Sequence, residues 1–345
     1  MRQGVLTALL FFSSWLLTCC SDPIHRQQSY VFGTLVEVSI WGEDEKTARD
    51  ATNAVLQEFD RLHNALHAWK PSDLSALNAA ISKAEKKTVS PELASILADA
   101  TRFAEASGES FDPAIGKLVQ LWGFHADEFK PVRPDPKDIA HLVQANPRMS
   151  DLVIAGDVVS SRNDAVQVDL GGYAKGYALD RAATILRARG IKNALVNIGG
   201  NIIAIGEHGN RPWRVGIQHP RKPGPIATID LYDGEAVGTS GDYQRYFELD
   251  GKRYCHIIDP RTGYPVQGVE AVTVIAPRGP QTGTISDVAS KPLFIAGTAG
   301  WRAAAARMAI EEALLIDANG EVYLTQRMAK RLEFSDPKTV RHEVP

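Results

Sequence analysis

The stretch Asp169-Leu-Gly-Gly-Tyr-Ala-Lys-Gly-Tyr-Ala-Leu-Asp180 combines a carboxylate, three glycines and a lysine. Residues 166–168 alternate apolar with polar ahead of it, as in a half-buried strand, and a helical pattern follows over 174–190. A glycine turn between a strand and a helix presents free N–H groups and the positive end of the helix dipole to an anion. The stretch therefore predicts a phosphate cradle, in which Lys175 adds a charge and Asp169 could hold a metal. Glycines at such a turn can also serve packing alone.

The composition is typical of a soluble globular protein. The 345 residues are 44% hydrophobic and 23% charged, which supplies enough apolar material for one large core or two smaller ones. The formal net charge is −3, and no long run of Lys and Arg interrupts the sequence. Nucleic-acid-binding proteins carry basic patches, so we predict no nucleic-acid partner.

The first residues resemble a bacterial lipoprotein signal. Arg2 precedes the apolar run 5–17, which is too short to span a bilayer comfortably, and Cys19 and Cys20 follow this run. We expect a signal peptide over 1–20 and a lipid anchor on one of the two cysteines, each of which has a leucine three residues before it. This pattern predicts a lipid-anchored protein on the periplasmic side of a bacterial membrane, with the inner membrane expected.

The rest of the chain is predicted to form one folded domain over 30–328, between a short tether over 21–29 and a polar C-terminal tail over 329–345. After the signal, Cys255 is the only cysteine, which excludes a disulfide framework. Helical periodicity appears at 48–66, 90–108, 174–190, 286–295 and 303–310. Strands are expected at 34–40, 166–168, 194–198, 202–205, 213–217, 226–231, 272–274, 314–316 and 322–324, with a hairpin at 246–254. The predicted fold class is α+β, with mixed, mostly antiparallel sheets and helices packed against them.

The closest grouping of potentially catalytic side chains follows the hairpin. His256, Asp259 and Arg261 lie within a few residues of one another at a strand end, and the polar segment 239–242 lies upstream. A lone histidine at a strand end is often structural. Here a carboxylate and a guanidinium lie close to it, and they favour a catalytic or phosphate-binding role as strongly as a structural one.

Seven blocks in order resemble the FAD:protein FMN transferases, the ApbE family of flavin transferases, many of which carry a lipoprotein signal. The blocks are Phe32-Gly-Thr34, Trp69 to Asn78, Phe111-Asp-Pro to Phe124, Asp169 to Gly176, Asn197 to Gly200, Thr239 to Tyr243 and His256 to Gly263. The resemblance runs from about residue 30 to 325 and implies a tunnelling-fold-like ApbE core.

The resemblance implies an enzyme that transfers FMN from FAD to a threonine or serine hydroxyl of an acceptor protein and releases AMP, with Mg²⁺ at the pyrophosphate. The expected acceptor is a membrane-associated redox subunit. Two alternatives remain: an FAD pyrophosphatase that yields FMN and AMP, and a non-catalytic flavin-binding lipoprotein. A dinucleotide oxidoreductase does not fit, because the glycine pattern differs and no acidic residue stands at the distance after the glycines where such enzymes bind the ribose.

The same resemblance assigns roles to individual residues. The catalytic candidates are His256, Asp259 and Lys175. The residues expected to bind FAD are Gly33, Thr34, Trp69, Asn78, Asp112, Asp169, Gly171, Gly172, Asp180, Gly200, Thr239, Ser240, Gly241, His256 and Arg261. The expected metal ligands are the main-chain carbonyl of Ala174 and the side chain of Asp287.

One position departs from the family pattern. Four residues after Asp287 the family has a threonine that helps to bind Mg²⁺, and this chain has Lys291. An ammonium has no lone pair, so Lys291 would repel Mg²⁺ or replace its charge beside Asp287. The alternative is that Lys291 points from its helix into solvent.

Overall fold

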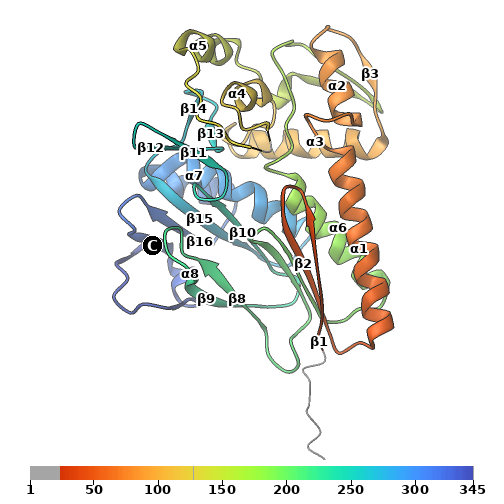
Figure 1. Cartoon of the computed structure of the whole chain (residues 1–345), viewed down its shortest axis with the longest axis vertical. Coiled ribbons are helices and arrows are strands. Elements are labelled where there is room, and N and C mark those ends of the chain that lie inside the picture. Colours follow the sequence, from red (N-terminus) through yellow and green to blue (C-terminus); the bar gives the residue numbers. More distant parts are fainter. Residues whose placement is uncertain (1–23, 127, 345) are drawn as a thin grey trace, which may run out of the picture.

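A nine-stranded sheet forms the centre of the computed structural model, which describes residues 24–126 and 128–344 (Figure 1). The strand order is β1-β2-β6-β7-β10-β15-β16-β17-β19, and each neighbouring pair is antiparallel except β17 and β19. The strands are β1 (Ile24–Val31), β2 (Thr34–Trp41), β6 (Ala194–Ile198), β7 (Asn201–Ile205), β10 (Ala236–Gly241), β15 (Val269–Ala276), β16 (Glu312–Asp317), β17 (Val322–Thr325) and β19 (Arg341–Val344). The predicted α+β class with mostly antiparallel strands is confirmed.

Smaller sheets and hairpins surround the main sheet. One three-stranded sheet contains β18 (Glu333–Phe334), β9 (Pro225–Leu231) and β8 (Trp213–Gln218). Another contains β3 (Lys87–Thr88), β5 (Val158–Ser161) and β4 (Leu152–Ala155). The two hairpins pair β11 (Tyr246–Leu249) with β12 (Lys252–Cys255), and β13 (Ile258–Asp259) with β14 (Tyr264–Pro265). Residues alternate between buried and exposed along β8, which is the predicted pattern for a strand with one face on a core.

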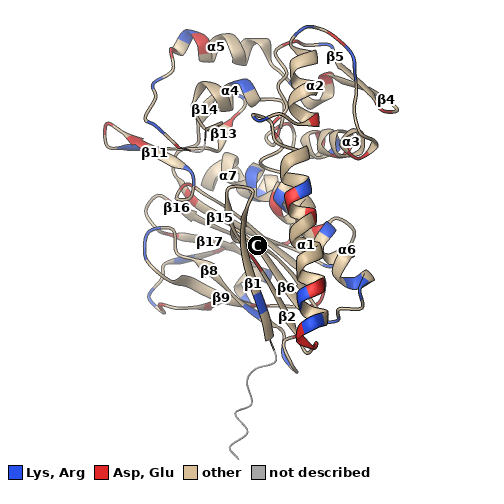
Figure 2. Cartoon of the chain, turned by 45° about the vertical axis from the view of Figure 1, so that its right-hand side comes forward, with Lys and Arg blue, Asp and Glu red and all other residues tan. Residues whose placement is uncertain are grey.

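Helices cover one side and the upper end of the main sheet (Figure 1). They are α1 (Glu45–Ala65), α2 (Asp73–Ile81), α3 (Pro91–Ala106), α4 (Gly116–Leu121), α5 (Pro136–Ala145), α6 (Ala174–Ala188), α7 (Thr282–Arg307) and α8 (Gln326–Ala329), with a 3₁₀ turn at Met149–Asp151. α3 begins as its sequence predicts, because the Ser90 side chain accepts from Leu93 N–H and Pro91 occupies the first turn. Lys and Arg alternate with Asp and Glu along α1 in Figure 2, as expected for a helix with one solvated face.

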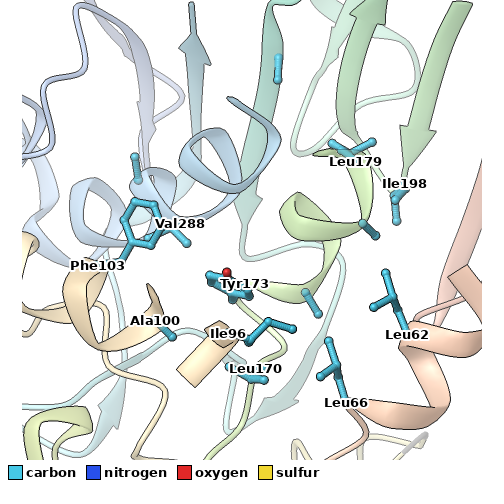
Figure 3. Packing of buried hydrophobic residues seen from close by; sticks show 14 of the residues in the cluster. Leu62, Leu66, Ile96, Ala100, Phe103, Leu170, Tyr173, Leu179, Ile198 and Val288 are labelled. Atoms are coloured by element: carbon cyan, nitrogen blue, oxygen red, sulfur yellow. The ribbon is translucent and has the colours of Figure 1, made fainter. Parts of the chain in front are cut away.

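The glycine turn lies over a tightly packed part of the core. Figure 3 shows Tyr173, at the start of α6, among Ile96, Ala100 and Phe103 of α3 and next to Leu170. Tyr173 is fully buried, and its hydroxyl donates to the Asp99 carboxylate at 2.7 Å. A buried hydroxyl with its own acceptor fixes the backbone that leads into α6.

α7 joins two segments that the sequence predicted as separate helices, 286–295 and 303–310. It begins earlier, at Thr282, and contains one residue outside helical geometry, Gly297, with φ 63° and ψ −173°. Pro292 also lies inside it. The two predicted helices therefore continue one another across this break.

The folded domain extends beyond both predicted boundaries. Within the expected tether 21–29, the chain enters the sheet at Ile24 as strand β1, which pairs along its length with β2. Within the expected tail 329–345, β18 pairs with β9 and β19 pairs with β17. Backbone pairing fixes these segments, and a few apolar side chains among the polar ones, such as Ile24 and Phe334, pack on the core.

The expected signal peptide over 1–20, with Cys19 and Cys20, lies outside the described residues. Among residues 24–126 and 128–344, no helix combines the length and the apolar character needed to cross a membrane.

Candidate active site

A cavity of about 1240 Å³ lies where the upper end of the main sheet meets the helices and loops above it. Binding sites for drug-sized ligands are commonly about 300–1,000 Å³, so this cavity has room for a dinucleotide. The structure brings fifteen of the predicted site residues to its wall: Gly33, Thr34, Trp69, Asp112, Asp169, Gly171, Gly172, Ala174, Lys175, Gly200, Thr239, Ser240, Gly241, His256 and Lys291.

The glycine turn forms one wall of this cavity, and Asp169 organises it. The Asp169 carboxylate accepts from Gly171 N–H at 2.7 Å through Oδ1 and from the Trp69 indole N–H at 3.1 Å through Oδ2. Both carboxylate oxygens therefore already have donors. Asp169 orients Trp69 and the turn, and this arrangement does not favour the metal-binding role that was considered for it.

Asn78 does not line the cavity, although it was expected to bind FAD. Its side chain donates to Val168 O at 2.9 Å and accepts from Val168 N–H at 2.8 Å. The predicted strand at 166–168 is not formed, and only an isolated bridge joins Gln167 to Ile115. Asn78 thus supplies the hydrogen bonds that a neighbouring strand would give, and it holds the backbone that leads into the glycine turn.

Three basic side chains form a cationic cluster at the cavity: Lys175 on α6, Lys291 on α7, and Arg245 in the loop before β11. Burial lowers the pKa of Lys175, the nearby Asp287 carboxylate partly offsets this effect, and the other two cations add to it. Arg245 also donates to Phe124 O at 2.9 Å. A cluster of this kind suits a ligand with more than one negative charge.

Asp287 lies directly behind the cationic cluster, and its side chain is 1% exposed. Its Oδ2 accepts from Gly176 N–H at 2.9 Å, and its Oδ1 pairs with the Lys291 ammonium. Burial alone would raise the pKa of Asp287, but the charges of Lys291 and Lys175 hold it below its ordinary value. Asp287 is therefore a carboxylate that remains ionised while buried.

Gly176 permits this contact, and sequence reasoning gave it no role. A Cβ at Gly176 would lie 2.5 Å from Gly283 O and 2.7 Å from Asp287 Cβ. Helices α6 and α7 can approach this closely only without a side chain at that position. A glycine inside a helix is costly, so Gly176 within a helical pattern was a usable signal.

His256 lies beside the cationic cluster, after β12. Its Nδ1 is 3.2 Å from Arg245 O. A carbonyl only accepts, so Nδ1 carries the hydrogen and Nε2 is left unprotonated as an acceptor. Burial first, and then the three cations of the cluster, lower the pKa of His256 to about 3. His256 is therefore neutral at pH 7.

Three other predicted site residues serve the fold. Asp259 does not line the cavity. Its carboxylate pairs with the Arg261 guanidinium at 2.8 Å and accepts from the Arg261 main-chain N–H in the β13–β14 turn. Asp180 lies at the start of α7, where its carboxylate accepts from Gly283 N–H at 2.7 Å and from Thr284 N–H at 2.8 Å. Asp259, Arg261 and Asp180 therefore hold turns and helix ends outside the cavity wall, and FAD binding by them stays a prediction.

Asp112 lines the cavity and also supports its wall. It accepts from Ala114 N–H at 2.9 Å and from Met149 N–H at 3.1 Å. Burial raises its pKa to about 7, although these two hydrogen bonds act in the opposite direction. Asp112 therefore orders the segment around Phe111 that faces the glycine turn.

Strand β10 contributes the opposite wall. The Ser240 hydroxyl is 2.7 Å from the hydroxyl of Ser290 on α7, and Ser290 donates to Asp287 O at 2.8 Å. Thr239 N–H donates to Asn201 Oδ1 at 3.2 Å. These contacts couple β10 to the same turn of α7 that carries Asp287.

Aromatic rings gather at another part of the cavity wall. Trp69 lies 5.4 Å from His125 between ring centroids, and Phe32 lies 5.7 Å from His63. Of these, sequence reasoning selected only Trp69. His125 directly follows the block that ends at Phe124, and His63 lies six residues before Trp69, but neither belongs to a motif block, so only the fold shows that they line the cavity.

The predicted magnesium ligands do not form a magnesium site by themselves. Among residues 24–126 and 128–344, no group of three or more His, Cys, Asp or Glu side chains is arranged to hold a metal ion. Ala174 lines the cavity, but Asp287 already binds the ammonium of Lys291. The alternative that Lys291 points into solvent is wrong, since its side chain is 14% exposed and lines the cavity.

Comparisons with known proteins agree with this geometry. The model of the ApbE family matches residues 32–315. The FAD:protein FMN transferase of Rhodobacter capsulatus is 43% identical over 311 residues, which are 90% of this chain and 59% of that protein's length. The FAD:protein FMN transferase of Treponema pallidum (strain Nichols) is 33% identical over 321 residues, which are 86% of this chain and 85% of its own. The crystal structure of the ApbE protein of Thermotoga maritima has a TM-score of 0.81 at 31% identity and covers 89% of this chain and 99% of that one.

Proposed function

The chain belongs to the ApbE family, and we propose that it is an FAD:protein FMN transferase, which moves FMN from FAD to a threonine or serine hydroxyl of an acceptor protein and releases AMP. The observation that carries this proposal is the position of His256 beside the cationic cluster, with its Nδ1 at 3.2 Å from Arg245 O, in a cavity large enough for FAD.

The cavity offers different chemistry to different parts of FAD. The cationic cluster and the N–H groups of the glycine turn suit the pyrophosphate, which carries the negative charge of the molecule. Trp69 offers a ring face held in place by Asp169, which suits stacking on a planar ring. FAD therefore lies with its pyrophosphate between Lys175 and Lys291.

The reaction then needs one proton acceptor. The acceptor hydroxyl oxygen attacks the phosphorus on the FMN side, the bond from that phosphorus to the AMP phosphate breaks, and AMP leaves. The hydroxyl proton passes to Nε2 of His256, whose Nδ1–H stays on Arg245 O. The negative charges of bound FAD offset the cations that lower the pKa of His256, so the imidazole becomes a better base in the complex. The cationic cluster stabilises charge on the pyrophosphate as the bond breaks.

The test is incubation of the protein with FAD and a threonine-containing candidate acceptor. We expect AMP in solution and flavin fluorescence on the acceptor band in equal amounts. AMP without flavin on any acceptor would instead favour FAD pyrophosphatase activity, and FAD binding without AMP would favour a flavin-binding lipoprotein.

The acceptor and the location complete the proposal. A flavin transferase needs a protein acceptor, and we propose a membrane-associated redox subunit. A lipid anchor on Cys19 or Cys20 would hold the enzyme on the periplasmic side of the membrane near that subunit. Intact-mass analysis of the membrane fraction tests this, and an unmodified protein that retains the residues before Cys19 would contradict it.

A further inference from the structure

The Lys291 ammonium occupies the place opposite Asp287 where a metal ion was predicted. It donates to Asp287 O at 2.7 Å and pairs with Asp287 Oδ1. Gly176 N–H satisfies the remaining carboxylate oxygen at 2.9 Å. A cation that took the position of the ammonium at Oδ1 would have to displace Lys291 from this carboxylate oxygen.

The stem of Lys291 is also packed in place. A Cβ at Gly172 would lie 3.3 Å from Lys291 Cε and 3.3 Å from a ring carbon of Phe111. The glycine turn therefore leaves just enough room for the methylene chain to pass, and the side chain is 14% exposed. A stem packed against the glycine turn places the charge with little freedom to move away.

The donors that remain do not favour Mg²⁺. Magnesium requires nearly octahedral oxygen coordination at about 2.0–2.1 Å. Asp287 is the one carboxylate among the predicted ligands, and the charges of Lys175 and Lys291 act on it. An additional cation at this carboxylate would face repulsion from both.

We propose that the ammonium of Lys291 supplies the fixed positive charge at the FAD pyrophosphate, so that this chain binds and cleaves FAD without a divalent metal ion at Asp287. This inference rests on the proposed function. Three basic side chains, Lys175, Lys291 and Arg245, stand against the single carboxylate of Asp287, which leaves a surplus of two basic groups beside the two negative charges of a pyrophosphate diester. Asp287 then serves as a positioning residue for Lys291.

The experiment compares the parent, Lys291→Thr and Lys291→Met, with Lys83→Thr as a matched control at an exposed site after α2. Manganese, the probe for a magnesium site, is titrated by electron paramagnetic resonance with and without FAD. FAD affinity and AMP release are measured in a chelator and then in excess Mg²⁺. Circular dichroism checks that each variant folds.

For the parent and Lys83→Thr, we expect FAD affinity and AMP release in chelator within about threefold of the values in Mg²⁺, and no stoichiometric Mn²⁺ binding. Lys291→Met, which keeps the apolar stem, should bind FAD about tenfold more weakly in chelator. Lys291→Thr should bind one Mn²⁺ with FAD and depend on it.

One Mn²⁺ bound per parent chain in the presence of FAD, with affinity or AMP release lost in chelator, would overturn the inference. If a variant fails to fold, the parent titration alone still decides. If the parent binds FAD but releases no AMP in any buffer, the proposed function fails. Mn²⁺ binding and FAD affinity in chelator then still test whether Lys291 replaces a divalent metal ion at Asp287.

Discussion

Asp180 and Asp287 are two carboxylates at the contact between α6 and α7, the first half-buried and the second fully buried, and they have different roles. Asp180 receives two backbone N–H groups and the hydroxyl of Thr284, all from the start of α7. Asp287 receives one backbone N–H and a side-chain ammonium that lines the cavity. Their hydrogen-bond donors differ. A carboxylate that binds main-chain N–H groups of a neighbouring helix fixes that helix, whereas a carboxylate that binds a cation in the cavity orients this cation toward a ligand.

The largest expected effect is on stability at Asp180. Asp180→Ala would leave three donors at the start of α7 without their acceptor, and we expect the free energy of unfolding to fall by about 3 kcal/mol. Chemical denaturation measures this loss. FAD affinity of the folded protein, measured at low temperature, should stay unchanged.

Asp180→Asn is the matched control, because its amide oxygen still accepts from the α7 backbone, and it should recover part of the loss. A weaker FAD affinity with unchanged stability would show that Asp180 serves the cavity and that the two carboxylates are alike.

The opposite result is expected at Asp287. Asp287→Asn keeps an acceptor for Gly176 N–H but removes the charge that holds the Lys291 ammonium. We expect AMP release to fall about thirtyfold, which corresponds to about 2 kcal/mol for a hydrogen bond between charged groups. The free energy of unfolding should change less than in Asp180→Ala. An equal loss of stability in the two variants would show that Asp287 serves the fold in the same way as Asp180.

A pH titration extends the comparison to His256. Its pKa in the fold is about 3, below its ordinary value of 6.5, so between these values the unfolded chain binds a proton that the folded chain does not. The free energy of unfolding therefore falls as the pH drops from 6.5 toward 3, by at most about 1.4 kcal/mol per pH unit. His256→Gln should flatten this slope, as measured by denaturation across that range. A variant with the parental slope would show that His256 is not held neutral.

Asp112 gives a smaller effect of the opposite sign. Its pKa rises from 3.8 to about 7, so the folded chain holds a proton that the unfolded chain releases, and stability falls as the pH rises between these values. Asp112→Asn keeps the acceptor for Ala114 and Met149 and should remove this fall. Denaturation at pH 5 and pH 8 measures the difference, which should shrink in the variant and would stay equal if Asp112 were ionised throughout.

The sequence predicted the fold class and fifteen residues of the cavity wall, because strand alternation, helix starts and motif blocks are local signals. The sequence did not predict that Asp180 and Asn78 lie outside the cavity wall, because a carboxylate or amide within a motif has the same appearance whether its partner is a ligand or backbone. Those partners, Gly283 and Val168, lie far away in sequence. Arg245 and His125 lie just after two motif blocks, and only the fold shows that they line the cavity. The role of Lys291 depended on whether it faces Asp287 or solvent.

In the reaction that we propose, His256 acts as the base on FAD that the cationic cluster holds. The most direct measurement compares FAD affinity and AMP release for the parent and His256→Ala. A base acts in the transition state more than in the bound ground state, so we predict AMP release at least about a hundredfold slower, with FAD affinity changed less than about threefold. Unchanged AMP release in His256→Ala would contradict the account.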